Sequence, residues 1–165
     1  HSRLSYQNLL DGSLKSISSP GHNWKDYSLG RNSFASLIPK KTTAVDAVIR
    51  CVPTLNGKIS GLSFRVPTAI VCGSDLTIKV KKNVNTNEVK KFFLDLSKKE
   101  RKIYDYQTES LVSIDHLKTT KSSIIDSNYI DTVNSNLIKM VIWYDNEWGY
   151  SNRVVDILDY ITKRI

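Results

Sequence analysis

A series of strand-like segments with few helices between them limits what this chain can fold into. Apolar and polar residues alternate at positions 59–66, and a second strand is expected near 69–80. Short strand-like runs follow at 111–114, 122–125, 129–133 and 137–144. Runs of strands interrupted by only a few helices are typical of α+β proteins. We therefore expect an α+β fold with a mixed, largely antiparallel sheet, with helices covering one face and the other face open to a partner or a site.

Three helices are predicted beside these strands. Thr42 or Thr43 can cap the first, which Pro53 stops, and Asn85 can cap the second, with Glu88 reaching back to it. Their apolar stripes consist of Val45, Val48, Ile49 and Val52, of Val89, Phe92, Phe93 and Leu96, and, in the last helix, of Val154, Leu158, Ile161 and Ile165. Residues 11–36 have the composition of a long irregular loop.

Composition narrows the class of protein. A length of 165 residues suits one domain, and no stretch approaches the ~20 apolar residues of a membrane span. The net charge is +8, but the lysines occur as scattered pairs without a nucleic-acid-binding motif, so nucleic acid is not the expected partner. Cys51 and Cys72 have no metal-type spacing, so we expect two small buried residues, no metal site and a cytoplasmic setting.

Three segments are more specific than these patterns. They are Leu-Ile-Pro at 37–39 running to Thr42, then Leu-Asn-Gly-Lys at 55–58 with Gly-Leu-Ser-Phe-Arg-Val-Pro-Thr at 61–68 and Asp-Leu-Thr at 75–77, and finally Trp-Tyr-Asp-Asn-Glu-Trp-Gly-Tyr-Ser-Asn-Arg-Val-Val-Asp at 143–156. In this order and at this spacing they resemble the catalytic domain of phosphorylating glyceraldehyde-3-phosphate dehydrogenases. The resemblance covers essentially the whole chain and is weakest in residues 8–30 and 98–136.

The resemblance implies a two-domain enzyme of glycolysis in the cytoplasm, a homotetramer. In that family a Rossmann domain binds NAD, and a cysteine thiolate attacks the aldehyde of a sugar phosphate. A histidine takes the proton, hydride passes to NAD, and inorganic phosphate cleaves the resulting thioester. Residues 1–165 correspond to the C-terminal catalytic domain. No G-x-G-x-x-G occurs, so we expect the N-terminal domain, a partner of this one, to be missing and the isolated chain to be inactive.

The resemblance assigns the catalytic histidine and a phosphate-binding arginine. The family pattern H-x-x-T-x-x-Q corresponds to residues 1–7, which makes His1 the catalytic histidine, although Leu4 replaces a threonine that helps to hold the substrate phosphate. A tag remnant or frayed terminus is the alternative for His1. Arg65 matches the arginine that binds phosphate, on the strand face opposite Leu62 and Phe64. The alternative for Arg65 is a surface salt bridge.

Three further residues take roles from the same resemblance. Thr42 matches a threonine of the inorganic-phosphate site, with Thr43 where the family has glycine, and capping alone is the other explanation. Asn146 matches the residue that hydrogen-bonds the nicotinamide carboxamide, and Tyr150 matches an aromatic residue beside the ring. A turn held by polar side chains is the alternative for this pair. Arg31 fits an interface position.

Two other functions remain open. Erythrose-4-phosphate dehydrogenase is a close alternative, because that branch also tends to have an apolar residue where Leu4 stands, and Trp148 suits it. A non-catalytic basic interaction module is the alternative from another class. The choice between NAD and NADP is also open.

His22 and His116 match no motif position and are expected to be exposed loop residues. Neither Cys51 nor Cys72 lies in the sequence context of the family's nucleophile.

Overall fold

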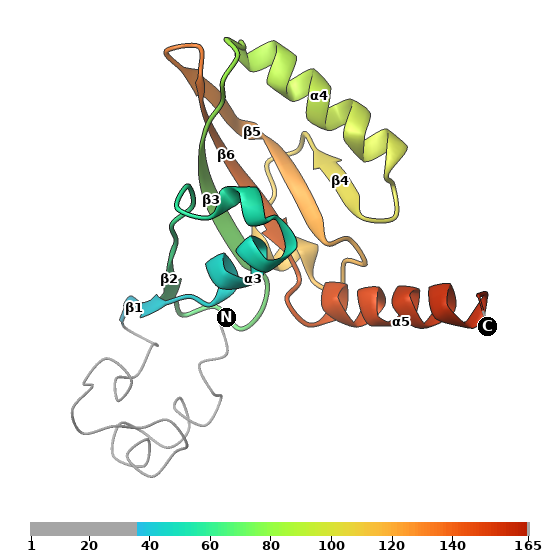
Figure 1. The fold of residues 1–165 in the computed structure, drawn as a ribbon. Coiled ribbons are helices and arrows are strands. Elements are labelled where there is room, and N and C mark those ends of the chain that lie inside the picture. Colours follow the sequence, from blue (N-terminus) through green and yellow to red (C-terminus); the bar gives the residue numbers. More distant parts are fainter. Residues whose placement is uncertain (1–35, 165) are drawn as a thin grey trace. The chain divides into compact units, whose positions relative to one another are not determined.

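A computed structural model describes residues 36–164 of the chain. The chain divides into two compact units, one up to Ala69 and one from Ile70 onwards. The helices and strands of both units are drawn in Figure 1.

Within its described residues, 36–69, the first unit contains a small antiparallel sheet, one short α-helix and a 3₁₀ turn. Its elements are β1 (Ile38–Lys41), α3 (Ala44–Cys51), the 3₁₀ helix η3 (Pro53–Leu55) and β2 (Leu62–Arg65). Strand β1 pairs with β2 so that Ile38 lies opposite Arg65 and Lys41 opposite Leu62. Helix α3 ends at Cys51, and Val52 caps it just before Pro53, a residue that cannot continue an α-helix. Gly57 has a φ of 72°, a left-handed conformation that glycine adopts without strain, and reverses the chain before β2.

The second unit is a four-stranded sheet with one helix packed on it. Its elements are β3 (Cys72–Lys79), α4 (Thr86–Lys99), β4 (Tyr104–Gln107), the 3₁₀ helix η4 (Ser113–His116), β5 (Ser123–Val133), β6 (Leu137–Tyr144) and α5 (Trp148–Thr162). The strands are ordered β3-β6-β5-β4, and only the β4–β5 pair is parallel. Helix α4 covers one face, whereas α5 leaves the end of β6 and extends beyond the sheet (Figure 1).

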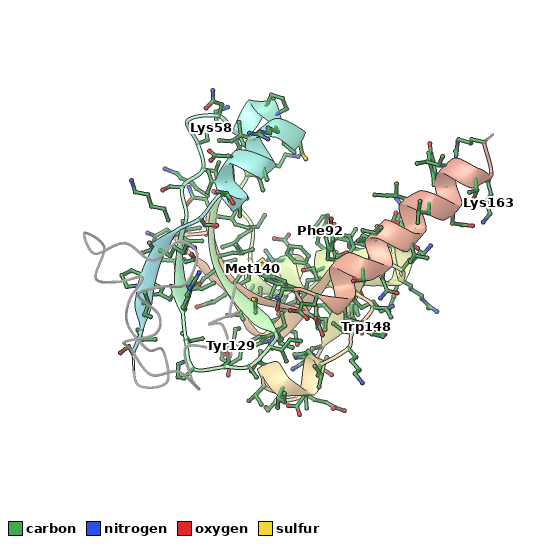
Figure 2. The ribbon with its side chains drawn as sticks, turned by 90° about the horizontal axis from the view of Figure 1, so that it is seen from below. Lys58, Phe92, Tyr129, Met140, Trp148 and Lys163 are labelled. Atoms are coloured by element: carbon green, nitrogen blue, oxygen red, sulfur yellow. The ribbon has the colours of Figure 1, made fainter. Side chains whose placement is uncertain are left out.

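The core of this unit lies between α4 and the sheet. It is formed by Val89, Ile125, Ile130, Ile138 and Met140, with Phe93, Tyr104 and Tyr106 packed against it. Figure 2 shows Met140 in this interior and Trp148 and Lys163 at the two ends of α5. Helix α4 begins with a capping box: Asn85 accepts a hydrogen bond from the backbone of Glu88, and Glu88 accepts one from the backbone of Asn85. A cap of this kind stabilises a helix by ~1 kcal/mol.

The other face of the sheet is built around Trp143. Its indole Nε1 donates to Asp126 at 3.0 Å, and its ring stacks on His116 with 5.9 Å between centroids. Gly73 leaves room for the indole, since a Cβ at that position would lie 2.9 Å from the Trp143 ring. His116 is 5% exposed, and its Nε2 has no hydrogen-bond partner among the described residues. On this face a buried histidine therefore stacks on a half-buried tryptophan whose indole N–H is bound by a carboxylate.

The predicted α+β class is confirmed, as is the Asn85–Glu88 capping box. The strand expected at residues 111–114 is wrong, because that stretch leads into the 3₁₀ helix η4, whose entry Asp115 stabilises by accepting from the backbone N–H of Val112. The two strands expected at 122–125 and 129–133 are one strand, β5, with an irregular register between Asp126 and Asp131. Strand β4 was not predicted, because its sequence Tyr-Asp-Tyr-Gln alternates over only four residues, which is too short to stand out from a loop.

Several side chains are exposed or buried contrary to expectation. His116 is buried rather than exposed, because the apolar ring of Trp143 covers it. Cys51 is exposed, since no residue of α3 is buried. Leu62 and Phe64 are 60% and 53% exposed, so the apolar face of β2 is the more exposed one. None of the described helices is long and apolar enough to cross a membrane.

Burial of His116 makes the stability of the chain depend on pH. Burial lowers the pKa of His116 from 6.5, although the carboxylates of Asp115, Asp126 and Asp105 act in the opposite direction. A histidine with a lowered pKa stays neutral in the folded state while the unfolded chain takes up a proton. Stability is therefore complete above the unfolded pKa and falls as the pH drops below ~6.5.

We expect His116→Phe to weaken this pH dependence, because phenylalanine preserves the stacking on Trp143 and cannot titrate. Urea unfolding of both proteins at about pH 7.5 and about pH 5 measures the effect. The unfolding free energy of the variant should fall less between the two pH values. An equal fall in both proteins would show that His116 does not contribute.

Candidate functional site

Arg65 is the sequence-predicted phosphate ligand of the first unit. It ends β2 opposite Ile38, and its side chain is half-buried. Its Nε is buried and has no hydrogen-bond partner among the described residues. A buried donor without an acceptor costs ~1–3 kcal/mol, and more when the group is charged. An anion beside this guanidinium would supply the missing acceptor, and phosphate suits its planar fork of donors.

Thr42 lies between β1 and α3 and caps the helix. Its Oγ1 accepts a hydrogen bond from the backbone N–H of Ala44 at 3.1 Å, whereas Thr43 makes no side-chain capping bond. Gly61 packs against it, since a Cβ there would lie 3.5 Å from the Thr42 methyl group. A hydroxyl that accepts one bond can still donate another. Thr42 can therefore cap α3 and donate to an anion at once.

Arg65 and Thr42 lie at opposite ends of the two-stranded sheet. Because Arg65 pairs with Ile38, it is four residue steps along β1 from Thr42. At ~3.3 Å a step, their Cα atoms are ~13 Å apart. This separation suits two anions, one at each residue, better than one phosphate-sized hollow shared by both. His1, the sequence-predicted catalytic histidine, lies outside the described residues.

In the second unit, Asp145 holds the turn between β6 and α5. The side chain is 2% exposed. One carboxylate oxygen accepts from the backbone N–H groups of Glu147 and Trp148 at 3.0 and 2.8 Å, and the other accepts from the backbone N–H of Lys118 at 2.8 Å. Burial alone would raise the pKa of Asp145, but these hydrogen bonds outweigh it and lower the pKa. The carboxylate therefore fixes the backbone on both sides of Asn146.

Asn146 follows Asp145 and is half-buried. Its side-chain oxygen accepts from the thiol of Cys72 at 3.7 Å, and its amide nitrogen makes no hydrogen bond to a described residue. Cys72 also acts on Tyr144: burial raises the pKa of that phenol, and the thiol raises it further. Tyr150, in the first turn of α5, is 70% exposed. The side chains of Asn146 and Tyr150 are therefore accessible to a ligand.

Arg153 anchors the base of α5. Its guanidinium donates to the backbone oxygens of Lys102 and Thr120 at 3.0 and 3.4 Å and pairs with Asp156 at 2.8 Å. Gly149 allows the helix to approach this segment, because a Cβ there would lie 2.8 Å from the backbone oxygen of Lys121. The sequence pattern did not single out Asp145, Gly149 or Arg153 for this role. An aspartate just before a helix was the available signal.

The sequence-predicted residues thus fall into two groups. Arg65 and Thr42 belong to the first unit, and Asn146 and Tyr150 belong to the second. Their roles as phosphate and cofactor ligands remain predictions. Within residues 36–164, no three His, Cys, Asp or Glu side chains are grouped as ligands for a metal ion.

Comparison with known proteins identifies relatives of the whole chain. Residues 13–146 match the family model described as the C-terminal domain of glyceraldehyde 3-phosphate dehydrogenase. The chain is 40% identical over 165 residues to glyceraldehyde-3-phosphate dehydrogenase of Glossina morsitans morsitans, covering 99% of the chain and 47% of the relative. It is 41% identical over 144 residues to the cytosolic enzyme of Mesembryanthemum crystallinum, covering 87% of the chain and 43% of the relative. The chain therefore spans less than half the length of these relatives.

We expect Asp145→Asn to destabilise the chain by about 2 kcal/mol, because an amide accepts backbone hydrogen bonds at only one of its two ends. The loss should shrink as the pH falls through the lowered pKa of Asp145, where the wild-type carboxylate also becomes protonated. Urea unfolding measures it. Asp75→Asn is the control, since Asp75 pairs with Lys139 at the surface and exposed pairs contribute little. Equal losses in both variants would contradict the anchoring role.

Proposed function

Since the chain belongs to the family of the glyceraldehyde 3-phosphate dehydrogenase C-terminal domain, we propose that it is the catalytic domain of an NAD-dependent phosphorylating aldehyde dehydrogenase. The substrates would be glyceraldehyde 3-phosphate and inorganic phosphate, in cytoplasmic glycolysis. The chain spans less than half of its relatives, so the NAD-binding domain and the nucleophilic cysteine would come from the N-terminal half of a longer protein, a homotetramer.

The Nε of Arg65, which is buried and has no hydrogen-bond partner among the described residues, is the observation that carries this proposal. Its side chain would bind the phosphate of the sugar, and the Thr42 hydroxyl would bind the attacking inorganic phosphate. The ~13 Å between their Cα atoms supports this division, because substrate and co-substrate must be held at the same time. Leu4 stands where a threonine would give the sugar phosphate another hydrogen bond, so more of its binding falls to Arg65.

The remaining residues would act on the proton and the cofactor. His1 would take the proton of the attacking thiol, so that the thiolate adds to the aldehyde carbon and forms a thioester once hydride has left. Inorganic phosphate would then displace the thiolate and yield an acyl phosphate. NAD supplies the hydride acceptor. The Asn146 amide would orient its carboxamide, and Tyr150 would lie beside the ring.

Helix α5 supports the proposal that the N-terminal domain is a partner. Several of its apolar side chains are more than half exposed, namely Val155, Ile157, Leu158 and Tyr160. An apolar helix face of this size needs a cover in water. More than half the length of the relatives lies outside this chain, and we propose that this missing half covers the helix.

We expect Arg65→Ala to lower kcat/KM for glyceraldehyde 3-phosphate about a hundredfold in the full-length protein, because a charge-assisted phosphate contact is lost. NAD reduction followed by absorbance measures it. Arg50→Ala, in α3 of the same unit, is the control. Erythrose 4-phosphate is assayed in parallel, and a higher kcat/KM for it would favour the alternative enzyme. The isolated chain should reduce no NAD. An unaffected Arg65→Ala enzyme would refute the assignment.

We also expect Leu158→Asp to destabilise the full-length protein but to leave the isolated chain nearly unchanged, because only in the full-length protein would the helix face be covered. Thermal unfolding of both forms measures this. Thr162→Asp places the same charge on an exposed polar position of α5 and serves as the control. A similar effect of Leu158→Asp in both forms would exclude the N-terminal domain as the cover.

A further inference from the structure

The positive charge of the second unit is concentrated around α4. Residues 79–102 contain nine lysines and arginines but only three acidic residues. Charge of one sign on a helix surface is often simply solvated, so it indicates a site only where a hollow gathers it. Such a hollow lies at the C-terminal end of α4.

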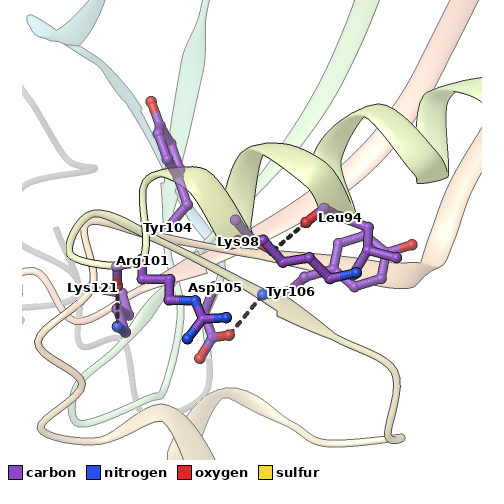
Figure 3. A pocket seen from close by; sticks show the side chains of 8 residues that line it. Leu94, Lys98, Arg101, Tyr104, Asp105, Tyr106 and Lys121 are labelled. Carbon is purple, nitrogen blue, oxygen red and sulfur yellow. Dashed lines mark hydrogen bonds between the residues drawn. The ribbon is translucent and has the colours of Figure 1, made fainter.

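Eight described residues line this hollow, which has a volume of about 310 Å³. Figure 3 shows it, with side chains from α4, from the turn after it, from β4 and from the segment before β5. Lys98, Arg101 and Lys121 bring three positive charges, and Asp105 is the only acidic residue of the lining. Leu94, Tyr104 and Tyr106 form an apolar and aromatic wall. The volume is within the range of small-molecule sites.

The three cations differ in how they are already used. Lys98 lies in the last turn of α4, where a positive charge suits the helix dipole. The ammonium of Lys121 donates to the backbone oxygen of Arg101 and is thereby fixed at the hollow. The Arg101 guanidinium makes no hydrogen bond or ion pair with another described residue. The helix dipole therefore accounts for the position of Lys98, but not for the N–H donors of Arg101 and Lys121 beside the hollow.

The walls of the hollow are supported from behind. Tyr104 and Tyr106 pack against the core of the sheet, and the buried hydroxyl of Ser97 donates to the backbone oxygen of Leu94 at 2.9 Å. The Asp105 carboxylate accepts from the backbone N–H of Tyr106 at 2.8 Å, which occupies part of its acceptor capacity. A ligand in the hollow would thus meet three cations and two partly buried tyrosines.

We propose that this hollow binds a small organic phosphate, in which a phosphomonoester is joined to a flat or apolar group. Arg101 and Lys121 bind the phosphate, because guanidinium and ammonium groups together neutralise its charge of nearly two. Tyr104 and Tyr106 contact the apolar part. The site contains none of the residues proposed above for the sugar phosphate, the inorganic phosphate or the cofactor.

The hollow borders the base of α5. The backbone of Lys102 and Thr120, each next to a cation of the site, accepts the hydrogen bonds of Arg153, and the backbone of Lys121 contacts Gly149. A ligand that bridges Arg101 and Lys121 therefore joins the two segments that carry the helix. Binding should raise the melting temperature, as any ligand of the folded state does.

NMR titration of the ¹⁵N-labelled chain with inorganic phosphate and with phenyl phosphate tests the proposal. The chain carries Arg65→Ala, so that phosphate binding at that residue does not interfere. Amide shifts should centre on residues 97–106 and 121, and phenyl phosphate should bind more tightly. Arg101→Gln and Lys121→Gln should each weaken binding about tenfold. Lys99→Gln is the matched control, since Lys99 has the same charge on the same helix but does not line the hollow.

Three outcomes would overturn the proposal. Equal losses in Lys99→Gln and Arg101→Gln would show diffuse attraction of anions to a basic surface. Equal affinities for phosphate and phenyl phosphate would show that Tyr104 and Tyr106 do not contribute to the site. A single-stranded oligonucleotide that binds more tightly, with shifts spread over residues 79–102, would indicate a surface for nucleic acid instead. The failure of this site would leave the roles proposed for Arg65 and Thr42 untouched.

Discussion

The carboxylate of Asp145 accepts three backbone hydrogen bonds from two segments that are far apart in the chain. It joins the end of β6 to the start of α5 and to the loop at Lys118. Because the chain turns from β6 into α5 within three residues here, backbone N–H groups would otherwise be buried without acceptors. The position of Asn146, the direction of α5 and the course of the segment before β5 all depend on this one buried charge.

Burying an ionised carboxylate costs desolvation free energy, and the hydrogen bonds of Asp145 offset that cost. Desolvation alone raises the pKa of Asp145, yet the net shift is downward. Arg153, in the second turn of α5, makes a similar anchor, because its guanidinium donates to two backbone oxygens and pairs with Asp156. The base of α5 is therefore held by polar groups, while its apolar side chains remain exposed. Such a helix can be fixed in direction before it finds its partner.

Local signals predicted the parts of the fold that local interactions determine. The Asn85–Glu88 capping box and the strand ending at Tyr144 could be found because each depends on neighbouring residues. Strand β4 could not, since its two tyrosines face the core only through pairing with β5, and His116 is buried only because Trp143 covers it. Arg65, Thr42, Asn146 and Tyr150 were chosen by resemblance, and no local periodicity marks them.

The distribution of charge separates the two proposed phosphate regions by their chemistry. Arg65 is half-buried on a short strand, so an anion bound there would satisfy one buried Nε–H donor, and loss of that one partner would be costly. The hollow beside α4 instead gathers three partly solvated cations, so its affinity depends on their number and on salt. The first region would therefore bind an anion through one buried donor, and the second through the combined charge of several cations. Contacts with Tyr104 and Tyr106 would make the second region prefer phosphates that carry a flat or apolar group.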